Sequence, residues 1–280
     1  MKFIEEKIFR ILMYISLLIV ASFVISVLWS IFSKGFPVLD WKMVSTIPGA
    51  GFYVGGEGGF LNAIMGSVYI VLGATFIGLT ISIPVVFYLN VYLKKDSIFG
   101  YIARLVFDVL FGIPSIVYGA FAFTIMIIIG IRASLLGGII VETLLIIPIL
   151  IRSMDEVART VPKELLEAAF SLGATRIQTI GVIMRQIAPA VATATLLSVG
   201  RAMGDAAGVM FTAGFTDYIP ESLTDKAATL PLSVFFQLSV PQIEVQNRAY
   251  AAAVVLTIIV LVLSLSGRLI MRYFSKNKIL

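Results

Sequence analysis

Long stretches without charged residues alternate with short charged segments along this chain of 280 residues. An α-helix needs about 20 apolar residues to cross the hydrocarbon core of a bilayer, which is about 30 Å thick. The pattern therefore predicts an all-α polytopic membrane protein with six transmembrane helices in one domain, residues 1–280. The predicted spans are residues 11–32, 64–89, 114–131, 134–151, 189–212 and 249–273.

The segments between the predicted spans differ in length and character. Residues 94–113 are predicted to form an interfacial helix that leads into the third span. Residues 152–188 carry charges of both signs and have a helical pattern, whereas residues 33–63 are rich in glycine. Residues 214–248 contain Leu230-Pro231-Leu232 and an apolar run, which predicts a helix at the outer face.

Basic residues gather on one side of this topology. An even number of spans puts both termini on one side, and most of the 21 Lys and Arg residues fall on that side. Because cytoplasmic loops of membrane proteins are enriched in Lys and Arg, both termini are predicted to be cytoplasmic. The expected location is the cytoplasmic (inner) membrane, as a multi-pass protein surrounded by membrane lipid. The positive charge is then a topology signal, and no nucleic acid is expected as a partner.

Several kinds of chemistry are excluded by composition. The chain has no cysteine and no histidine, which rules out disulfides, cysteine nucleophiles, histidine bases and the usual zinc sites. No phosphate-binding loop of the Gly-x-x-x-x-Gly-Lys-Ser/Thr kind occurs, so the chain itself is not expected to bind or hydrolyse ATP. We therefore expect a protein that is not an enzyme and that holds no cofactor or metal.

One short helix is predicted inside the segment 152–188. Pro162 suits the first turn of a helix, and residues 163–172 can follow it as far as Gly173, which can end the helix in a left-handed conformation. Ala168 and Ala169 keep one side of this helix thin, so another surface can approach it closely. On these residues alone, a docking element and an ordinary solvated loop helix both remain open.

The spacing of Glu167, Ala168, Ala169, Gly173 and Ile183 resembles the EAA loop of the permease subunits of ATP-binding-cassette importers. In that family the loop inserts into a cleft of the ATPase subunit. The resemblance implies that these five residues couple the chain to a partner ATPase.

Further segments resemble the PstA-type permease subunit of the phosphate importer. They are residues 55–59, 62–66, 114–117, 200–205 and 230–231. The resemblance implies the type I importer permease fold and a role as half of the pathway for phosphate. It also implies a second, PstC-like permease subunit, two PstB-like ATPase subunits that bind the ATP, and an extracytoplasmic PstS-like phosphate-binding protein.

Arg201 is a charged residue inside the fifth predicted span. A charge at the centre of a membrane costs about 3 kcal/mol on insertion scales, so such residues are usually functional. Asp205, four residues later, is expected on the same helix face. Two interpretations are open: an ion pair that packs helices together, or a pathway site in which the planar donors of Arg201 contact phosphate oxygens. The resemblance implies a transport role for both positions, although Glu is usual in the family where this chain has Asp205.

Glu142 lies in the middle of the fourth predicted span and is the third candidate for the substrate pathway. It could pair with Arg201 or stay protonated. Residues 55–59 could form an anion-binding nest, or simply a flexible loop.

Three other functions remain open on the sequence. The chain could be a permease subunit for another oxyanion, such as sulfate or molybdate, or a secondary transporter that works alone. It could also be a membrane scaffold that signals phosphate status. The residues of the EAA loop argue against a transporter that works alone.

Overall fold

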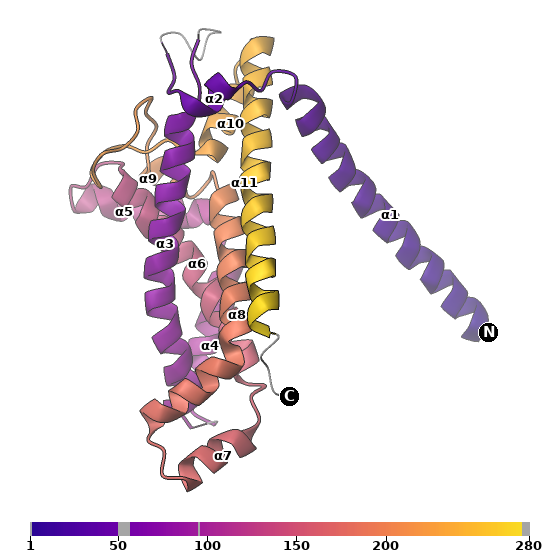
Figure 1. Ribbon diagram of the computed structural model, residues 1–280, viewed down its shortest axis with the longest axis vertical. Helices are drawn as coiled ribbons and strands as arrows, with labels where there is room; N and C mark the ends of the chain where they lie inside the picture. Colours follow the sequence, from indigo (N-terminus) through magenta and orange to yellow (C-terminus); the bar gives the residue numbers. More distant parts are fainter. Residues whose placement is uncertain (1, 50–56, 95, 276–280) are drawn as a thin grey trace.

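The computed structural model describes residues 2–49, 57–94 and 96–275, and it is built from helices (Figure 1). Over these residues the only β-structure is one isolated bridge between Pro48 and Gly58. The predicted all-α class is therefore confirmed. Five helices are long and apolar enough to cross a membrane. They are α1 (Lys2–Gly35), α3 (Leu61–Phe87), α6 (Leu135–Ala158), α8 (Arg176–Gly204) and α11 (Ile243–Ser275).

The core lies where α3, α6 and α8 pack together (Figure 1). Ala74 of α3, Ile146 and Leu150 of α6, and Ile187 and Ala194 of α8 belong to one fully enclosed apolar cluster. Small residues on α3 and α8 face large branched residues on α6, which lets the helices approach closely. The most buried of the long helices is therefore α6, with α3 and α8 on its flanks.

The third predicted span differs from the structure. Residues 114–131 do not form one membrane-length helix: α5 (Ser115–Ile128) has 14 residues and, at about 1.5 Å per residue, is too short to cross a bilayer core alone. It follows α4 (Ile98–Gly112) after a bend of 101°. Proline disfavours the helical conformation in the residue before it, and Ile113, which precedes Pro114, has an extended backbone. The part of the chain that the structure describes has six candidate spans when α4 and α5 count as one bent span, and five otherwise.

The fifth predicted span also has different limits. Helix α8 begins at Arg176, where Thr175 and Gln178 form a capping box, and it runs through Pro189 to Gly204. Figure 1 shows that α8 changes direction along its length, and the proline inside it gives the physical reason. Residues 209–212 form a separate short helix, α9 (Val209–Thr212). The segment 152–188 is correspondingly shorter as a loop, because α6 continues to residue 158.

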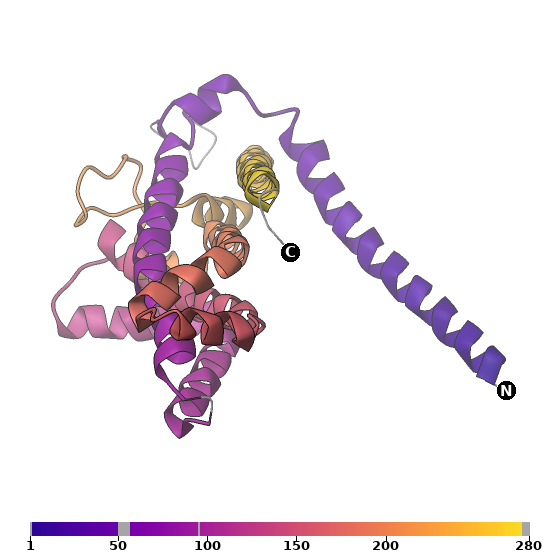
Figure 2. The same cartoon turned by 60° about the horizontal axis from the view of Figure 1, so that its bottom comes forward.

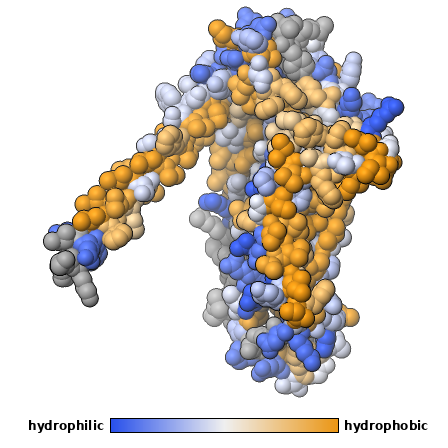
Figure 3. Space-filling view, turned by 180° about the vertical axis from the view of Figure 1, so that it is seen from behind, coloured by the Kyte–Doolittle hydropathy of each residue, from blue (hydrophilic) through white to orange (hydrophobic). Residues whose placement is uncertain are grey.

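The two ends of the bundle carry different short helices. At one end lie α2 (Trp41–Ser45) and α10 (Leu230–Leu238), the helix expected within residues 214–248 (Figure 1). At the other end, near the close of α11, lies α7 (Lys163–Ser171). Figure 3 shows apolar side chains in a tall band over the bundle, with hydrophilic residues at both ends and also beside the band. This is the surface expected of a protein that crosses a bilayer.

Helix α1 stands away from the rest of the molecule in both ribbon views (Figures 1 and 2). It joins the bundle at its C-terminal end, where Gly35 lies against the backbone of Tyr250 in α11. None of its most apolar stretch of 18 residues is buried.

Candidate functional site in a broken helix

The predicted pair Arg201 and Asp205 lies where α8 breaks. Arg201 is in the last turn of α8, which ends at Gly204, and Asp205 has an extended backbone with φ −80° and ψ 122°. The two residues therefore do not share a helix face, and the structure corrects that expectation. Among the described residues, no ion pair joins Arg201 to Asp205.

Asp205 organises the turn that follows. Its Oδ2 accepts a hydrogen bond of 2.7 Å from the backbone N–H of Gly208, which leads into α9. Carboxylates stabilise the exposed N–H groups at the start of a helix in this way. The turn from Asp205 to Gly208 is thus an ordered interruption between two helices. Non-helical backbone at membrane depth is tolerated where protein or a water-filled cavity surrounds it.

The turn is held between α5 and α6 by very close packing. A Cβ atom at Gly119 of α5 would lie 2.6 Å from the backbone oxygen of Gly208, so only glycine allows this approach. On the other side, a Cβ atom at Gly208 would lie 3.2 Å from Cγ1 of Val141 in α6. The two glycines let three backbone segments meet at the site.

Glu142 reaches the same turn from α6, and it is completely buried. The Cβ position of Gly208 lies 2.6 Å from Oδ2 of Asp205 and 3.6 Å from Oε1 of Glu142, so the two carboxyl groups converge there. Within the described part of the chain, neither oxygen of Glu142 has a hydrogen-bond partner. The structure thus brings Glu142 and Asp205 together at the break, and Arg201 lies in the last turn of α8, directly before it.

Arg201 is exposed in the single chain. A guanidinium inside a membrane-spanning segment is costly in contact with hydrocarbon, so it faces water or protein. An exposed arginine beside a helix break can bind an oxyanion through its fork of N–H donors.

The predicted coupling residues lie at the opposite end of the bundle. Glu167 and Ala168 are exposed on α7, and Ala169 is half-buried. Gly173 has φ 79°, the left-handed conformation expected from its position after the helix. Ile183 differs from the other four, because it lies in the apolar core on α8.

Apolar side chains are also exposed around α7. Leu172, which follows α7, is 89% exposed, and Ile177, in the first turn of α8, is 72% exposed. Small exposed side chains and large apolar ones occur together here, which is typical of a protein-binding surface.

The glycine-rich segment 55–59 lies partly outside the described residues. In the described part, Glu57 forms an ion pair with Lys42 at 2.6 Å, and both side chains are largely exposed. The hydrogen bond and the charge of Lys42 hold the pKa of the Glu57 carboxyl below its ordinary value. Nothing in this contact favours an anion site.

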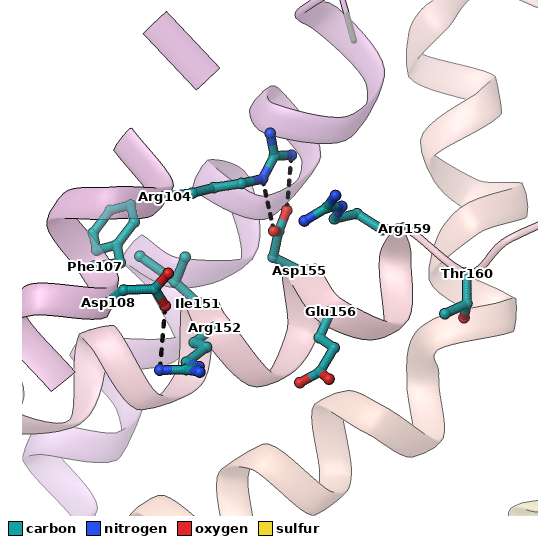
Figure 4. Close-up of a pocket in the computed structure, with 9 residues that line it drawn as sticks. All are labelled: Arg104, Phe107, Asp108, Ile151, Arg152, Asp155, Glu156, Arg159 and Thr160. Atoms are coloured by element: carbon teal, nitrogen blue, oxygen red, sulfur yellow. Dashed lines mark hydrogen bonds and ion pairs between the residues drawn. The ribbon is translucent and has the colours of Figure 1, made fainter. Parts of the chain in front are cut away.

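A polar cluster at the α7 end of the bundle was missed by the sequence reasoning. Asp155 of α6 forms a bidentate ion pair with Arg104 of α4 beside a pocket of about 460 Å³ (Figure 4). In the sequence, Arg104 counted only as a basic residue near a span. The signal that could have revealed the pair was Asp155, an acidic residue within the last turn of an apolar helix.

Comparisons with known proteins show which family this chain and its fold resemble. Residues 82–279 match the family of binding-protein-dependent transport system inner membrane components. The chain is 32% identical to the phosphate transport system permease protein PstA of Haemophilus influenzae, over 94% of this chain and 92% of that protein. It is 34% identical to the PstA protein of Yersinia pestis, over 79% and 74% of the two chains. An inward-facing MetNI methionine ABC transporter has a similar fold, with a TM-score of 0.59 and 18% identity over 76% of this chain and 95% of that one.

The helical bundle, its broken helix and its family match define a polytopic membrane component of a transport system, which is not an enzyme. Within that class, the chain belongs to the family of PstA phosphate transport system permease proteins.

Proposed function

We propose that the chain is the transmembrane permease subunit of an ATP-driven phosphate importer in the cytoplasmic (inner) membrane, where it forms half of the translocation pathway. The observation that carries the proposal is the cluster of Arg201, Asp205 and Glu142 at the break in α8. Similarity to PstA proteins over most of the chain supports phosphate as the substrate.

The cluster suits phosphate in two respects. The guanidinium of Arg201 offers planar paired donors to two phosphate oxygens. Oδ2 of Asp205 accepts the hydrogen bond from Gly208 that holds the turn, and Oδ1 is the oxygen that we propose faces the substrate. That oxygen can accept a hydrogen bond from the P–O–H group that phosphate still carries near neutral pH, whereas sulfate has no proton to donate and is repelled.

Helix α7 is the proposed docking element for the ATPase. It is short and exposed, and it lies between α6 and α8, which both reach the core. Displacement of α7 by a partner would therefore be passed directly to spanning helices. The proposed assembly contains a second, PstC-like permease, two PstB-like ATPases and an extracytoplasmic PstS-like binding protein.

Both termini are proposed to be cytoplasmic, on the same side as α7. The chain has no native cysteine, so single introduced cysteines report on exposure. In intact cells an impermeant thiol reagent is expected to label Leu223→Cys, in the loop before α10, and to leave Leu172→Cys unlabelled. The opposite labelling pattern would contradict this orientation.

The substrate site is tested by uptake of radiolabelled phosphate in cells that express the chain with its partner subunits. Arg201→Lys keeps the charge but loses the paired donors, so uptake is expected to fall about tenfold to hundredfold at normal membrane levels. Asp205→Asn is expected to weaken uptake and to make sulfate a better competitor. Arg185→Lys, an exposed arginine nearer the start of α8, serves as the matched control and is expected to have no effect.

Each alternative gives a different result in the same assay. Normal uptake by Arg201→Lys would remove Arg201 from the pathway. If the unaltered complex carried sulfate or molybdate in preference to phosphate, the chain would serve another oxyanion. Uptake that persisted without the ATPase subunits would indicate a secondary transporter.

A further inference from the structure

Three helices are joined by a polar cluster near the end of the bundle that carries α7. We call Asn90, Arg104 and Asp155 the Asp155 cluster. Nε and Nη2 of Arg104 donate to the two carboxylate oxygens of Asp155 at 2.8 Å and 3.1 Å, and the side-chain amide of Asn90 donates to Oδ1 at 2.7 Å. Asn90 lies in η2 (Tyr88–Tyr92), a π-helical turn that continues α3. The cluster therefore fixes the ends of α3, α4 and α6 relative to one another.

The cluster is well enclosed. The side chain of Asp155 is 9% exposed and that of Arg104 is 25% exposed. Arg104 also donates through Nη2 to the backbone oxygen of Leu89 at 3.4 Å. Charged hydrogen bonds in such surroundings are strong and directional, so they define one arrangement of the three helices.

Asp155 lies directly before the segment that carries α7. Helix α6 ends at Ala158, and α7 begins at Lys163. Leu166 of α7 and Val161 of the connecting segment pack against the same core cluster that contains Met154. A displacement of α7 therefore acts on α6 within one turn of Asp155.

A second arginine, Arg159, lies close to Asp155. Arg159 follows Asp155 by four residues and is the residue that caps α6, where it keeps helical backbone angles, so the two side chains lie on one side of the helix end. It forms no ion pair with any residue that the structure describes. Figure 4 shows its guanidinium next to Asp155, across from Arg104.

There is also room for the arginines to move. Arg104 and Arg159 both line two cavities, one of about 460 Å³ and one of about 370 Å³. A neighbouring pair in the first cavity, Asp108 with Arg152 at 3.2 Å, is already complete, so Arg152 is not the available partner.

The geometry points to an exchange of ion pairs at Asp155 during the transport cycle. In the arrangement seen here, Asp155 holds Arg104, and α4 is tied to α6. When the ATPase displaces α7, Asp155 passes to Arg159, and α4 stays joined to α6 only through the more exposed pair of Asp108 and Arg152, so the two helices can shift relative to each other. Asp155, Arg104 and Arg159 would thus be positioning residues that link α7 to the spans. This inference rests on the proposed docking of α7 to an ATPase.

The exchange is tested in the assembled complex with spin labels at Tyr101→Cys on α4 and Val157→Cys on α6, two exposed positions outside the cluster. We expect the distance between the labels to change when ATP is added. Arg159→Gln, an exposed residue whose loss should not disturb folding, is expected to keep the nucleotide-free distance. It should also lower the phosphate transported per ATP hydrolysed by about tenfold. Glu156→Gln, an exposed residue of the same pocket that forms no ion pair with any described residue, is the matched control and should behave as the unaltered chain.

Asp155→Asn and the double variant Arg104→Met with Asp155→Leu separate positioning from simple packing. An apolar pair can replace a buried ion pair at little cost in stability, so the double variant is expected to assemble but to transport poorly. The ion-pair exchange would be contradicted if the double variant transported the normal amount of phosphate per ATP hydrolysed, or if the distance between the labels still changed with ATP in Arg159→Gln. Either result would leave the proposed function intact. If the unaltered complex showed neither an ATP-dependent change nor phosphate uptake, the proposed function would fail with it.

Discussion

Helices α1 and α6 have nearly the same hydropathy and opposite surroundings. The mean hydropathy of their most apolar stretches is 2.7 and 2.2, yet none of that stretch is buried in α1 against 72% in α6. In α1 large apolar side chains such as Phe23 and Trp29 point outward all around the helix. In α6 the stretch contains Gly137, Gly138 and a buried Glu142. The comparison teaches that hydropathy identifies a membrane helix, whereas small and polar residues mark the side that packs against protein.

The strongest test of the packed region adds one methyl group. In Gly119→Ala the new Cβ would lie 2.6 Å from the backbone oxygen of Gly208, and the neighbouring atoms are also backbone, so the turn after Asp205 must shift. Overpacking of this kind costs about 1–3 kcal/mol, and we expect a lower Tm in detergent together with reduced phosphate uptake.

The matched control is Gly181→Ala on α8, where a Cβ atom would meet no atom within 4 Å. Alanine favours a helix over glycine by about 1 kcal/mol, so this variant should keep or raise the Tm. Equal effects of the two substitutions would show that the packing around Gly208 does not limit stability.

An exposed helix can be essential for transport even when it contributes little to stability. Substitutions at Gly173, directly after α7, test this for α7. Gly173→Pro removes the left-handed conformation, since φ of proline is fixed near −65°. It also removes the N–H that donates to the backbone oxygen of Phe170 at 2.9 Å. We expect normal membrane levels and an unchanged Tm, with uptake lost because α7 no longer meets the ATPase in the correct orientation.

Gly173→Asn is the control for this position, because asparagine tolerates the left-handed region and keeps the N–H. It is expected to retain most of the uptake. Undiminished uptake by Gly173→Pro would remove α7 from the coupling path.

The sequence reasoning succeeded where a single residue contradicted its surroundings. Glu142 and Arg201 stand out as charges in apolar stretches, and in the structure Glu142 lies against the turn at Gly208 while Arg201 lies in the last turn of α8 before it. It failed on Asp205, because the pattern of apolar residues continues past Gly204 while the helix does not. A helix break depends on how closely neighbouring backbones approach, as at Gly119 and Gly208, and periodicity carries no information on this.

The limits of helices near charged segments were predicted poorly for a different reason. The sequence predicts a helical pattern in residues 176–188 but begins the fifth span only at residue 189, because the charges before it resemble those of a connecting segment. In the structure these residues are the first part of α8, stabilised by the capping box at Thr175. Arg104 and Asp155 were overlooked because charges at the end of a span have an ordinary explanation as topology signals. Only their contact across two helices shows another role.

The smallest effect is expected in α1, at Phe23→Ala. This side chain is 70% exposed, and surface substitutions usually change stability by no more than about 0.5 kcal/mol, so the Tm of the isolated subunit should not change. Leu150→Ala in α6, a fully buried position, should by contrast lower the free energy of unfolding by about 2–5 kcal/mol.

The two variants are compared by measuring thermal unfolding, both in the isolated subunit and in the assembled complex. A fall in Tm for Phe23→Ala as large as that for Leu150→Ala in the isolated subunit would contradict the separation of α1 from the bundle. A fall seen only in the complex would show that a partner subunit covers this face of α1, because lipid alone packs equally well against a smaller side chain.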